Sequence, residues 1–124
     1  FVKSAKDNRP IEIYGDGSQT RVFCHVHDVV DALLLLLSNN KTVGEVYNIG
    51  GVGEVSILDL ANRILEHTNS NSKVVFKDYS EVYPPTFEDM MRRVPDISKI
   101  SKAINWSPSR NLDQIIQDVN LSFS

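Results

Sequence analysis

The chain has 124 residues, of which 41% are hydrophobic and 23% are charged. This is the composition of an ordinary globular protein and excludes a disordered or fibrous one. A formal net charge of −3 argues against broad nucleic-acid binding, which needs clustered Lys and Arg. The single cysteine, Cys24, excludes an internal disulfide, so we expect a cytoplasmic protein. The longest apolar run, Ala32 to Leu37, is too short to span a membrane.

The first residue is Phe1 rather than Met, and no signal-peptide pattern follows it. We therefore interpret the chain as a piece of a longer protein. Its size allows one domain with a real core, so residues 1–124 are taken as a single portion.

The N-terminal third predicts two extended segments and one helix. Residues 11–14 alternate as in a strand, and the cluster Gly15–Ser18 ends it with a turn. Residues 22–26 are rich in β-formers, and Asp28 is a suitable N-cap for a helix over 29–38. This helix is apolar on every face, so we expect burial on several sides.

The middle of the chain predicts a strand, a helix and a further strand. Residues 46–49 have the composition of a buried strand. Ser56 with Asp59 resembles a capping box at the start of a helix that continues to about residue 65 with helical apolar spacing. Residues 74–76 predict a short strand.

The last third predicts a long loop and two helices. Residues 79–93 have no clear period and include two prolines, and loops of this length are usually functional or disordered. Asp96 can cap a helix that ends at Asn105, and Asn111 with Gln114 forms a capping pair for the final helix. Strands alternating with helices indicate an α/β architecture.

Three patterns that suggest chemistry have simpler structural readings. The glycine-rich segment 50–53 lacks the third small residue and the acidic residue that a dinucleotide site needs, so we interpret it as a turn. His25 and His27 lack an evident third metal ligand. Ser18 and Ser56 lack a base at a suitable spacing to act as nucleophiles. We therefore predict no metal site and no catalytic residue.

Three arginines are more informative. A guanidinium group is a planar fork that fits phosphate oxygens. Arg21 follows the glycine-rich turn, and Arg92 and Arg93 follow the long loop, so all three could converge on a diphosphate. Surface charge is the alternative that the residues alone leave open.

Five segments, in order along the chain, resemble the extended short-chain dehydrogenase family that acts on nucleotide sugars. They are IYGDGSQTR at 13–21, HVHDVVDA at 25–32, YNIGG at 47–51, RRVPDISK at 92–99 and NWSP at 105–108. Ser56 to Ala61 also resembles the helix that follows the YNIG strand in the family. The matches cover nearly the whole chain.

The resemblance implies an α/β fold of mixed short strands and helices, forming the C-terminal substrate-binding portion of an extended Rossmann-type NAD(P)-binding enzyme. The N-terminal Rossmann core, which carries NAD, would be a missing partner. The family includes UDP-glucose 4-epimerases, UDP-glucuronate decarboxylases and dTDP-glucose 4,6-dehydratases, which are isomerases and lyases. The implied substrate is a UDP- or dTDP-sugar, and the parent enzyme is expected to be a homodimer.

The resemblance also assigns roles to residues. The substrate-binding set that it implies is Tyr14, Arg21, Glu88, Asp89, Arg92 and Arg93. Tyr14 matches the position against the base, and Arg21 matches the arginine that reaches the diphosphate. Arg92 matches the arginine on the far side of the nucleotide, with Arg93 as the weaker candidate. Glu88 and Asp89 would lie near the ribose.

Two family motifs are absent from the chain: the GxxGxxG that holds NAD and the Tyr-x-x-x-Lys pair that handles the proton. Val22, His25 and His27 also depart from the family pattern, which leaves the subfamily open. We therefore expect the isolated chain to be inactive, to bind no cofactor tightly, and to self-associate through apolar surface. The alternative is a non-enzymatic module that binds a nucleotide or another protein.

Overall fold

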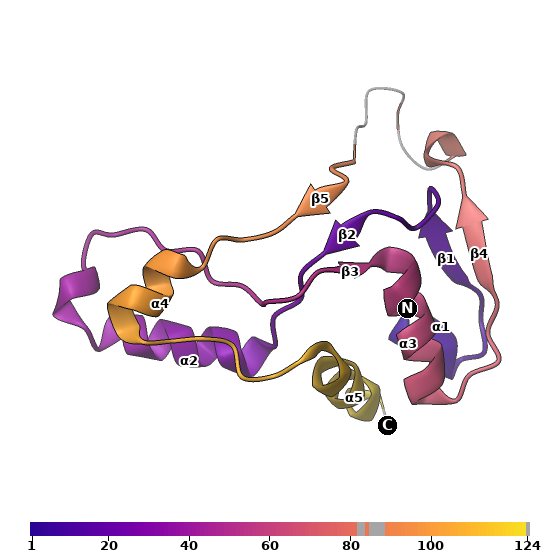
Figure 1. Ribbon diagram of the computed structural model, residues 1–124. Helices are drawn as coiled ribbons and strands as arrows, with labels where there is room; N and C mark the ends of the chain where they lie inside the picture. Colours follow the sequence, from indigo (N-terminus) through magenta and orange to yellow (C-terminus); the bar gives the residue numbers. More distant parts are fainter. Residues whose placement is uncertain (82–83, 85–88, 124) are drawn as a thin grey trace. The chain divides into compact units, whose positions relative to one another are not determined.

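The computed structural model describes residues 1–81, 84 and 89–123, which form two compact units (Figure 1). The first unit comprises residues 1–21, 55–93 and 116–124, and the second comprises residues 22–54 and 94–115. All described strands lie in the first unit, and the described elements of the second unit are helices. The chain as a whole has the α/β fold that the sequence predicts.

The first unit contains a parallel pair of strands. β1 (Ile11–Tyr14) pairs with β4 (Val74–Lys77), with Ile11 opposite Val74. Successive side chains of a strand point to opposite faces, and Ile11 and Ile13 are accordingly buried while Glu12 is exposed. The predicted strand over 11–14 is confirmed.

A second small sheet lies in the same unit. β2 (Thr20–Arg21) is its central strand, antiparallel to β3 (Val55–Ser56) and parallel to β5 (Arg92–Arg93). The sequence placed the extended segment at residues 22–26 instead, and this was wrong. Pairing with two partner strands decides where this strand lies, and β propensity is a weak guide to such long-range pairing.

The predicted loop over residues 79–93 is also more ordered at its ends than expected. The short 3₁₀ helix η2 (Tyr79–Glu81) begins it, and β5 ends it. β5 is only two residues long, too short to give a periodic signal in the sequence.

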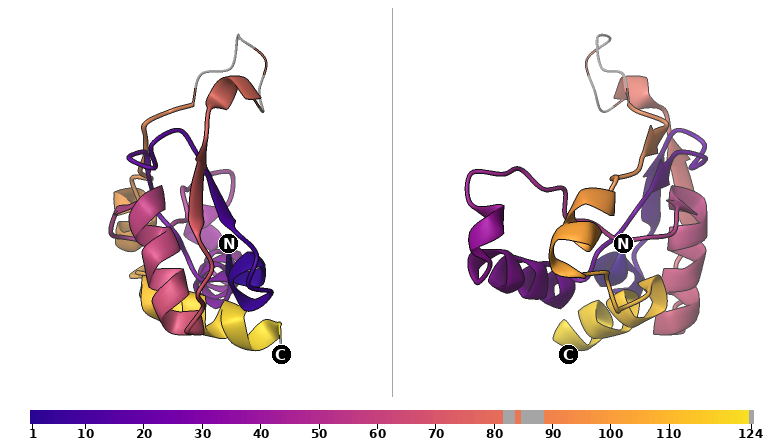
Figure 2. Two further views of the ribbon diagram at one scale, coloured as in Figure 1. Left: turned by 90° about the vertical axis from the view of Figure 1, so that its right-hand side faces the viewer. Right: turned by 60° about the vertical axis from the view of Figure 1, so that its left-hand side comes forward.

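The first unit contains the helices α1 (Val2–Lys6) and α3 (Ile57–Thr68) and the larger part of α5 (Leu112–Ser122). The Oγ of Ser56 accepts a hydrogen bond from the backbone N–H of Asp59 at 3.0 Å, which confirms the predicted cap. α3 packs against α1 and β1 (Figure 2). The buried apolar residues of this unit are Val2, Ala5, Ile11, Ile13, Val55, Leu60, Ala61, Ile64 and Ile116.

The second unit is built around α2 (Val26–Leu37) and α4 (Ser98–Ile104), with the short 3₁₀ helix η1 (Asn40–Thr42). Ala32, Ile100 and Trp106 form its core. α2 begins three residues earlier than predicted, because the Nδ1 of His25 caps it by accepting from the N–H of His27. Asp28, the predicted cap, is instead a buried residue inside the helix.

The expectation that this helix is buried on several sides was wrong. Six large apolar side chains of α2 are exposed, Leu35 among them, and five of the six recur at the spacing of one helix face: Val26, Val30, Leu33, Leu34 and Leu37. We call these five residues the α2 stripe. The described residues cover the helix on the face that carries Ala32, which is fully buried.

The predicted strand over residues 46–49 also does not form. Within the described part of the chain this segment has no paired strand, and Val46 is 81% exposed. A strand requires a neighbour for its backbone hydrogen bonds. The segment is therefore an irregular connection rather than part of a sheet.

The last helix, α5 (Leu112–Ser122), begins as predicted. The backbone N–H of Asn111 donates to Gln114 Oε1 at 2.9 Å, and the N–H of Gln114 donates to Asn111 Oδ1 at 3.0 Å. Asn105 ends α4 in the left-handed conformation, also as predicted. No helix of the described residues has the length and apolar character needed to cross a membrane.

Candidate functional site

A pocket of about 440 Å³ lies in the first unit. Its lining residues are Phe1, Glu12, Tyr14, Gln19, Arg21, Ile57, Tyr79, Asp89 and Arg93. Four of them belong to the predicted substrate-binding set: Tyr14, Arg21, Asp89 and Arg93. A larger hollow of about 550 Å³, at the end of β1 and β4, is more open, and no arginine is among its described lining residues.

The two small sheets bring these side chains together. Glu12 and Tyr14 lie two residues apart on β1, so they share the face of the strand that borders the pocket. In the second sheet Arg21 of β2 is the register partner of Arg93 of β5. Partner residues of adjacent strands lie on the same face, which places both arginines at the pocket.

The turn between β1 and β2 returns the chain to the pocket. Asp16 Oδ1 accepts from the backbone N–H of Ser18 at 2.9 Å and from its Oγ at 2.6 Å, and these hydrogen bonds lower the pKa of Asp16. Gly15 has φ +73°, and a Cβ there would lie 2.5 Å from Cε2 of Tyr79. The tight turn therefore leaves room for the Tyr79 ring at the pocket wall.

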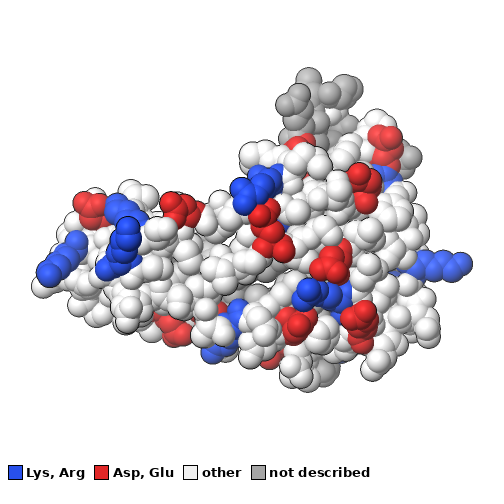
Figure 3. All heavy atoms as spheres, in the orientation of Figure 1, with Lys and Arg blue, Asp and Glu red and all other residues white. Residues whose placement is uncertain are grey.

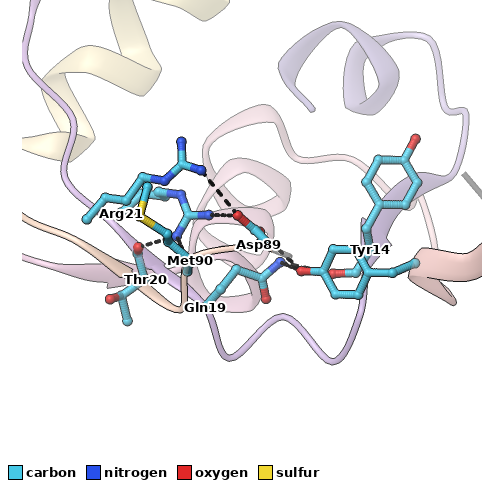
Figure 4. Close-up of polar contacts among 8 residues, drawn as sticks. Tyr14, Gln19, Thr20, Arg21, Asp89 and Met90 are labelled. Carbon is cyan, nitrogen blue, oxygen red and sulfur yellow. Dashed lines mark hydrogen bonds and ion pairs between the residues drawn. The ribbon is translucent and has the colours of Figure 1, made fainter. Parts of the chain in front are cut away.

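Asp89 is the centre of the polar contacts in the pocket (Figure 4). Its Oδ1 accepts from Nη2 of Arg21 at 2.7 Å and, more weakly, from Nη2 of Arg93 at 3.5 Å. Its Oδ2 accepts from the hydroxyl of Tyr79 at 3.2 Å. The Arg21 and Asp89 side chains are only 19% and 16% exposed, whereas Arg93 is 52% exposed.

Arg21 is also anchored to the backbone. Its Nη1 donates to the carbonyl of Thr20 at 2.7 Å and to that of Met90 at 2.8 Å. Together with the ion pair to Asp89, these bonds fix the position of the guanidinium group. Arg21 therefore links β2 to the segment that leads into β5.

Gln19 and Tyr79 were missed by the sequence analysis. Gln19 Nε2 donates to the carbonyl of Tyr14 at 2.9 Å and to the hydroxyl of Tyr79 at 3.1 Å. Burial and the hydrogen bond to Asp89 raise the pKa of Tyr79, which keeps it a donor. Gln19 stands within a family-like segment and could have been chosen, whereas Tyr79 lies in a stretch without any pattern.

The other two predicted residues are placed differently. Arg92 precedes Arg93 on β5, so its side chain leaves the strand on the opposite face. It is not among the described residues that line the pocket. Glu88 lies outside the described residues. The structure thus groups Arg93, rather than Arg92, with Tyr14 and Arg21.

The charged side chains that line the pocket are paired locally. Among the described lining residues, Arg21 and Arg93 are basic and Glu12 and Asp89 are acidic. Asp89 is paired with the two arginines, and Glu12 is paired with Lys77 at 2.7 Å. On the face drawn in Figure 3, basic and acidic side chains are likewise interspersed. An anionic ligand would therefore be met by specific guanidinium groups rather than by a broad basic surface.

Residues 50–53 do not offer an open cradle for NAD. A Cβ at Gly51 would overlap with the carbonyl oxygen of Phe23, and one at Gly50 would lie 2.5 Å from Cγ of Pro95. The space above these glycines is filled by the chain's own atoms. The segment therefore does not fit a dinucleotide pyrophosphate.

The two histidines remain side by side. The ring centroids of His25 and His27 lie 4.9 Å apart, and His25 is used as a helix cap. Over the described ranges, no group of three His, Cys, Asp or Glu side chains could hold a metal ion.

Residues 1–119 match the model of a protein family described as GDP-mannose 4,6 dehydratase. The chain belongs to this family. It is an extended short-chain dehydrogenase family of nucleotide-sugar enzymes, and the resemblance stated from the sequence is confirmed.

Two relatives in the family bear the names of decarboxylases. A UDP-N-acetyl-alpha-D-glucosaminuronate decarboxylase of Bacillus cytotoxicus is 35% identical over 118 residues, covering 95% of this chain and 36% of the relative. UDP-glucuronic acid decarboxylase 1 of Arabidopsis thaliana is 38% identical over 112 residues, covering 90% of this chain and 24% of the relative. The chain thus spans about a third or less of the length of these relatives.

Solved structures of the family have the same fold. The UDP-glucose 4-epimerase of Thermotoga maritima, solved with UDP-glucose, superposes with a TM-score of 0.85 at 25% identity, covering 98% of this chain and 37% of that one. The UDP-glucuronic acid 4-epimerase of Bacillus cereus, solved with UDP-glucuronic acid and NAD, superposes with a TM-score of 0.83 at 27% sequence identity. The match covers 99% of this chain and 38% of the epimerase chain. The predicted fold class, a portion of a Rossmann-type enzyme, is confirmed.

Proposed function

We propose that this chain is the substrate-binding portion of an NAD-dependent nucleotide-sugar epimerase, dehydratase or decarboxylase. It holds the nucleoside diphosphate of a UDP- or dTDP-sugar in the pocket between β1 and the β2–β5 pair. Residues 1–124 form one functional portion of the longer enzyme, which is cytoplasmic and homodimeric.

The observation that carries this proposal is the convergence of Tyr14, Arg21 and Arg93 on one pocket. An aromatic ring provides a flat apolar surface for a base, and two guanidinium groups on one sheet face suit a diphosphate. The similarity to structures solved with UDP-glucose and UDP-glucuronic acid supports the same class of ligand. Holding the nucleotide end would position the sugar for reaction, which is catalysis by positioning.

The chain by itself would not catalyse the reaction. It contains neither GxxGxxG nor Tyr-x-x-x-Lys, so it supplies no cofactor site and no base for the hydroxyl proton. Those groups belong to the N-terminal Rossmann portion of the parent enzyme, which is the expected partner of this chain. The α2 stripe is the surface that such a partner would cover.

Calorimetry with UDP and dTDP tests the proposal, and two adjacent arginines provide a matched pair of variants. We expect Arg93→Ala to weaken UDP binding about tenfold or more, because a charge-assisted contact to phosphate is lost. Arg92→Ala removes the same side chain from the opposite face of β5 and should change UDP affinity little.

In the full-length enzyme, Arg93→Ala should raise KM more than it lowers kcat. A larger loss of UDP affinity in Arg92→Ala would mean that the role implied by family resemblance is right and that the pocket is not the nucleotide site. Absence of binding to both UDP and dTDP in the wild-type chain and in the full-length enzyme would refute the proposed function.

A further inference from the structure

The carboxylate of Asp89 lies where the oxygens of an anionic ligand would be expected. Its Oδ1 accepts from the Nη2 atoms of both Arg21 and Arg93, which are the arginines among the described lining residues of the pocket. A phosphate oxygen would use the same donors in the same geometry. Asp89 and a bound phosphate therefore compete for the same guanidinium groups.

The pairing of charges makes this competition matter. Glu12 is already paired with Lys77 at 2.7 Å, so Asp89 is the described acidic lining residue that engages both arginines. With Asp89 ionised, a diphosphate would find the two guanidinium groups occupied and would face a carboxylate at short range. Like charges in a partly buried site repel appreciably, because water screens them less than at an open surface.

We propose that Asp89 is an internal anion that occupies Arg21 and Arg93 until a phosphate group takes its place, and that it thereby sets the affinity and charge selectivity of the pocket. This inference rests on the proposed function. Asp89 is a specificity-determining residue of the site, acting through the two arginines.

The contacts of the two arginines indicate how the exchange proceeds. Arg21 keeps its bonds to the carbonyls of Thr20 and Met90 when the carboxylate leaves, so it remains a fixed anchor. Arg93 is half exposed and holds Asp89 only at 3.5 Å, so it is the arginine that turns to the incoming phosphate. The hydroxyl of Tyr79 retains the other oxygen of Asp89.

A charge-specific pair of ligands tests this mechanism. Asp89→Asn keeps the shape of the side chain and the Oδ1 acceptor for Arg21 but removes the negative charge. We expect UDP to bind this variant about tenfold more tightly than the wild type, the factor that a modest charge repulsion represents. Uridine carries no phosphate, so its affinity should not rise, and the gain for UDP should shrink at high salt.

The control is Asp59→Asn, which removes the carboxylate of another Arg–Asp ion pair, with Arg63, on an exposed face of α3. It should leave both affinities unchanged. If Asp89→Asn does not fold, as judged by circular dichroism, Asp89→Ser serves instead, since its short side chain cannot occupy the arginines. The same gain for UDP is expected.

Each outcome has one reading. Weaker or unchanged UDP binding in a folded Asp89 variant overturns the inference and leaves the proposed function standing. An equal gain for UDP and uridine also overturns it, because the effect would not depend on charge. If neither the wild type nor any variant binds UDP or uridine, the proposed function itself fails.

Discussion

Asp28 lies in a segment that resembles the family, and its carboxylate has a structural role. It is 2% exposed, and its two carboxylate oxygens accept from the Oγ of Ser109 at 2.8 Å and from Arg110, through Nη1 at 2.7 Å and the backbone N–H at 3.1 Å. Burial raises the pKa of Asp28, but these hydrogen bonds outweigh it, and the pKa is lowered overall. Asp28 thus joins α2 to the segment before α5.

We predict that Asp28→Asn destabilises the second unit by about 3 kcal/mol, the low end of the cost of breaking a buried ion pair. Because the folded-state pKa of Asp28 lies below its unfolded value, its contribution is present above the unfolded pKa, near 4, and is lost as the pH falls through the folded pKa. Urea unfolding of both proteins between pH 7 and pH 3 measures this.

The two stability curves should converge towards the acidic end, because protonation removes the same charge that the substitution removes. A difference that stays constant across the pH range would mean that shape and packing, rather than the charge of Asp28, account for the loss. Asp31→Asn, on the exposed side of the same helix, serves as the control and should have little effect.

At the residue scale, four of the side chains named from family resemblance, Tyr14, Arg21, Asp89 and Arg93, line one pocket. Their role in binding a substrate stays a prediction. That Arg21 is tied to Asp89 could not be predicted, because the two are 68 residues apart and meet only through the pairing of β2 with β5. The same pairing separates Arg92 from Arg93.

At the scale of elements, the segment Gly50–Gly53 was interpreted as a turn from the spacing of its glycines. The structure gives a physical reason why two of these positions require glycine. Gly51 faces the carbonyl oxygen of Phe23, and Gly50 faces the ring of Pro95. Two backbone segments approach each other here more closely than any side chain would allow.

Gly51→Ala should therefore destabilise the second unit by about 3 kcal/mol or more, because the added methyl group meets rigid backbone that cannot change rotamer. Gly53→Ala is the control, since nothing lies within 4 Å of its Cβ position. Its φ of +86° should still cost about 1 kcal/mol. Thermal unfolding of the two variants gives the comparison, and an equal loss in both would contradict the close approach.

Helix ends that depend on residues close in the sequence were predicted well. Strands that depend on pairing with distant segments were not. The Ser56 cap of α3, the Asn111–Gln114 pair and the left-handed Asn105 depend on neighbours within a few residues. The strands β2 and β5 are two residues long and exist only through their ladder. Residues 46–49 have the composition of a strand but no partner among the described residues.

At the scale of the whole molecule, the α2 stripe is the main departure from an ordinary surface. Val26, Val30, Leu33, Leu34 and Leu37 recur at i, i+4, i+7, i+8 and i+11, the pattern of one helix face, and Leu37 is 83% exposed. Contiguous apolar surface of this kind usually marks an interface. The stripe is exposed within this chain, and the chain spans only 36% of the length of one relative and 37% of the length of a related structure.

We predict that the isolated chain self-associates through this stripe and that Leu34→Lys with Leu37→Lys shifts it towards monomer in sedimentation velocity. Both side chains are exposed, so the melting temperature of the isolated chain should hardly change. Asp31→Lys adds a lysine to the same helix outside the stripe and should leave association unchanged. In the full-length protein the double variant should lower stability, because lysines would be buried against the N-terminal portion. Equal stability of the full-length protein and its double variant would show that the stripe is exposed there too, and that the N-terminal portion docks elsewhere.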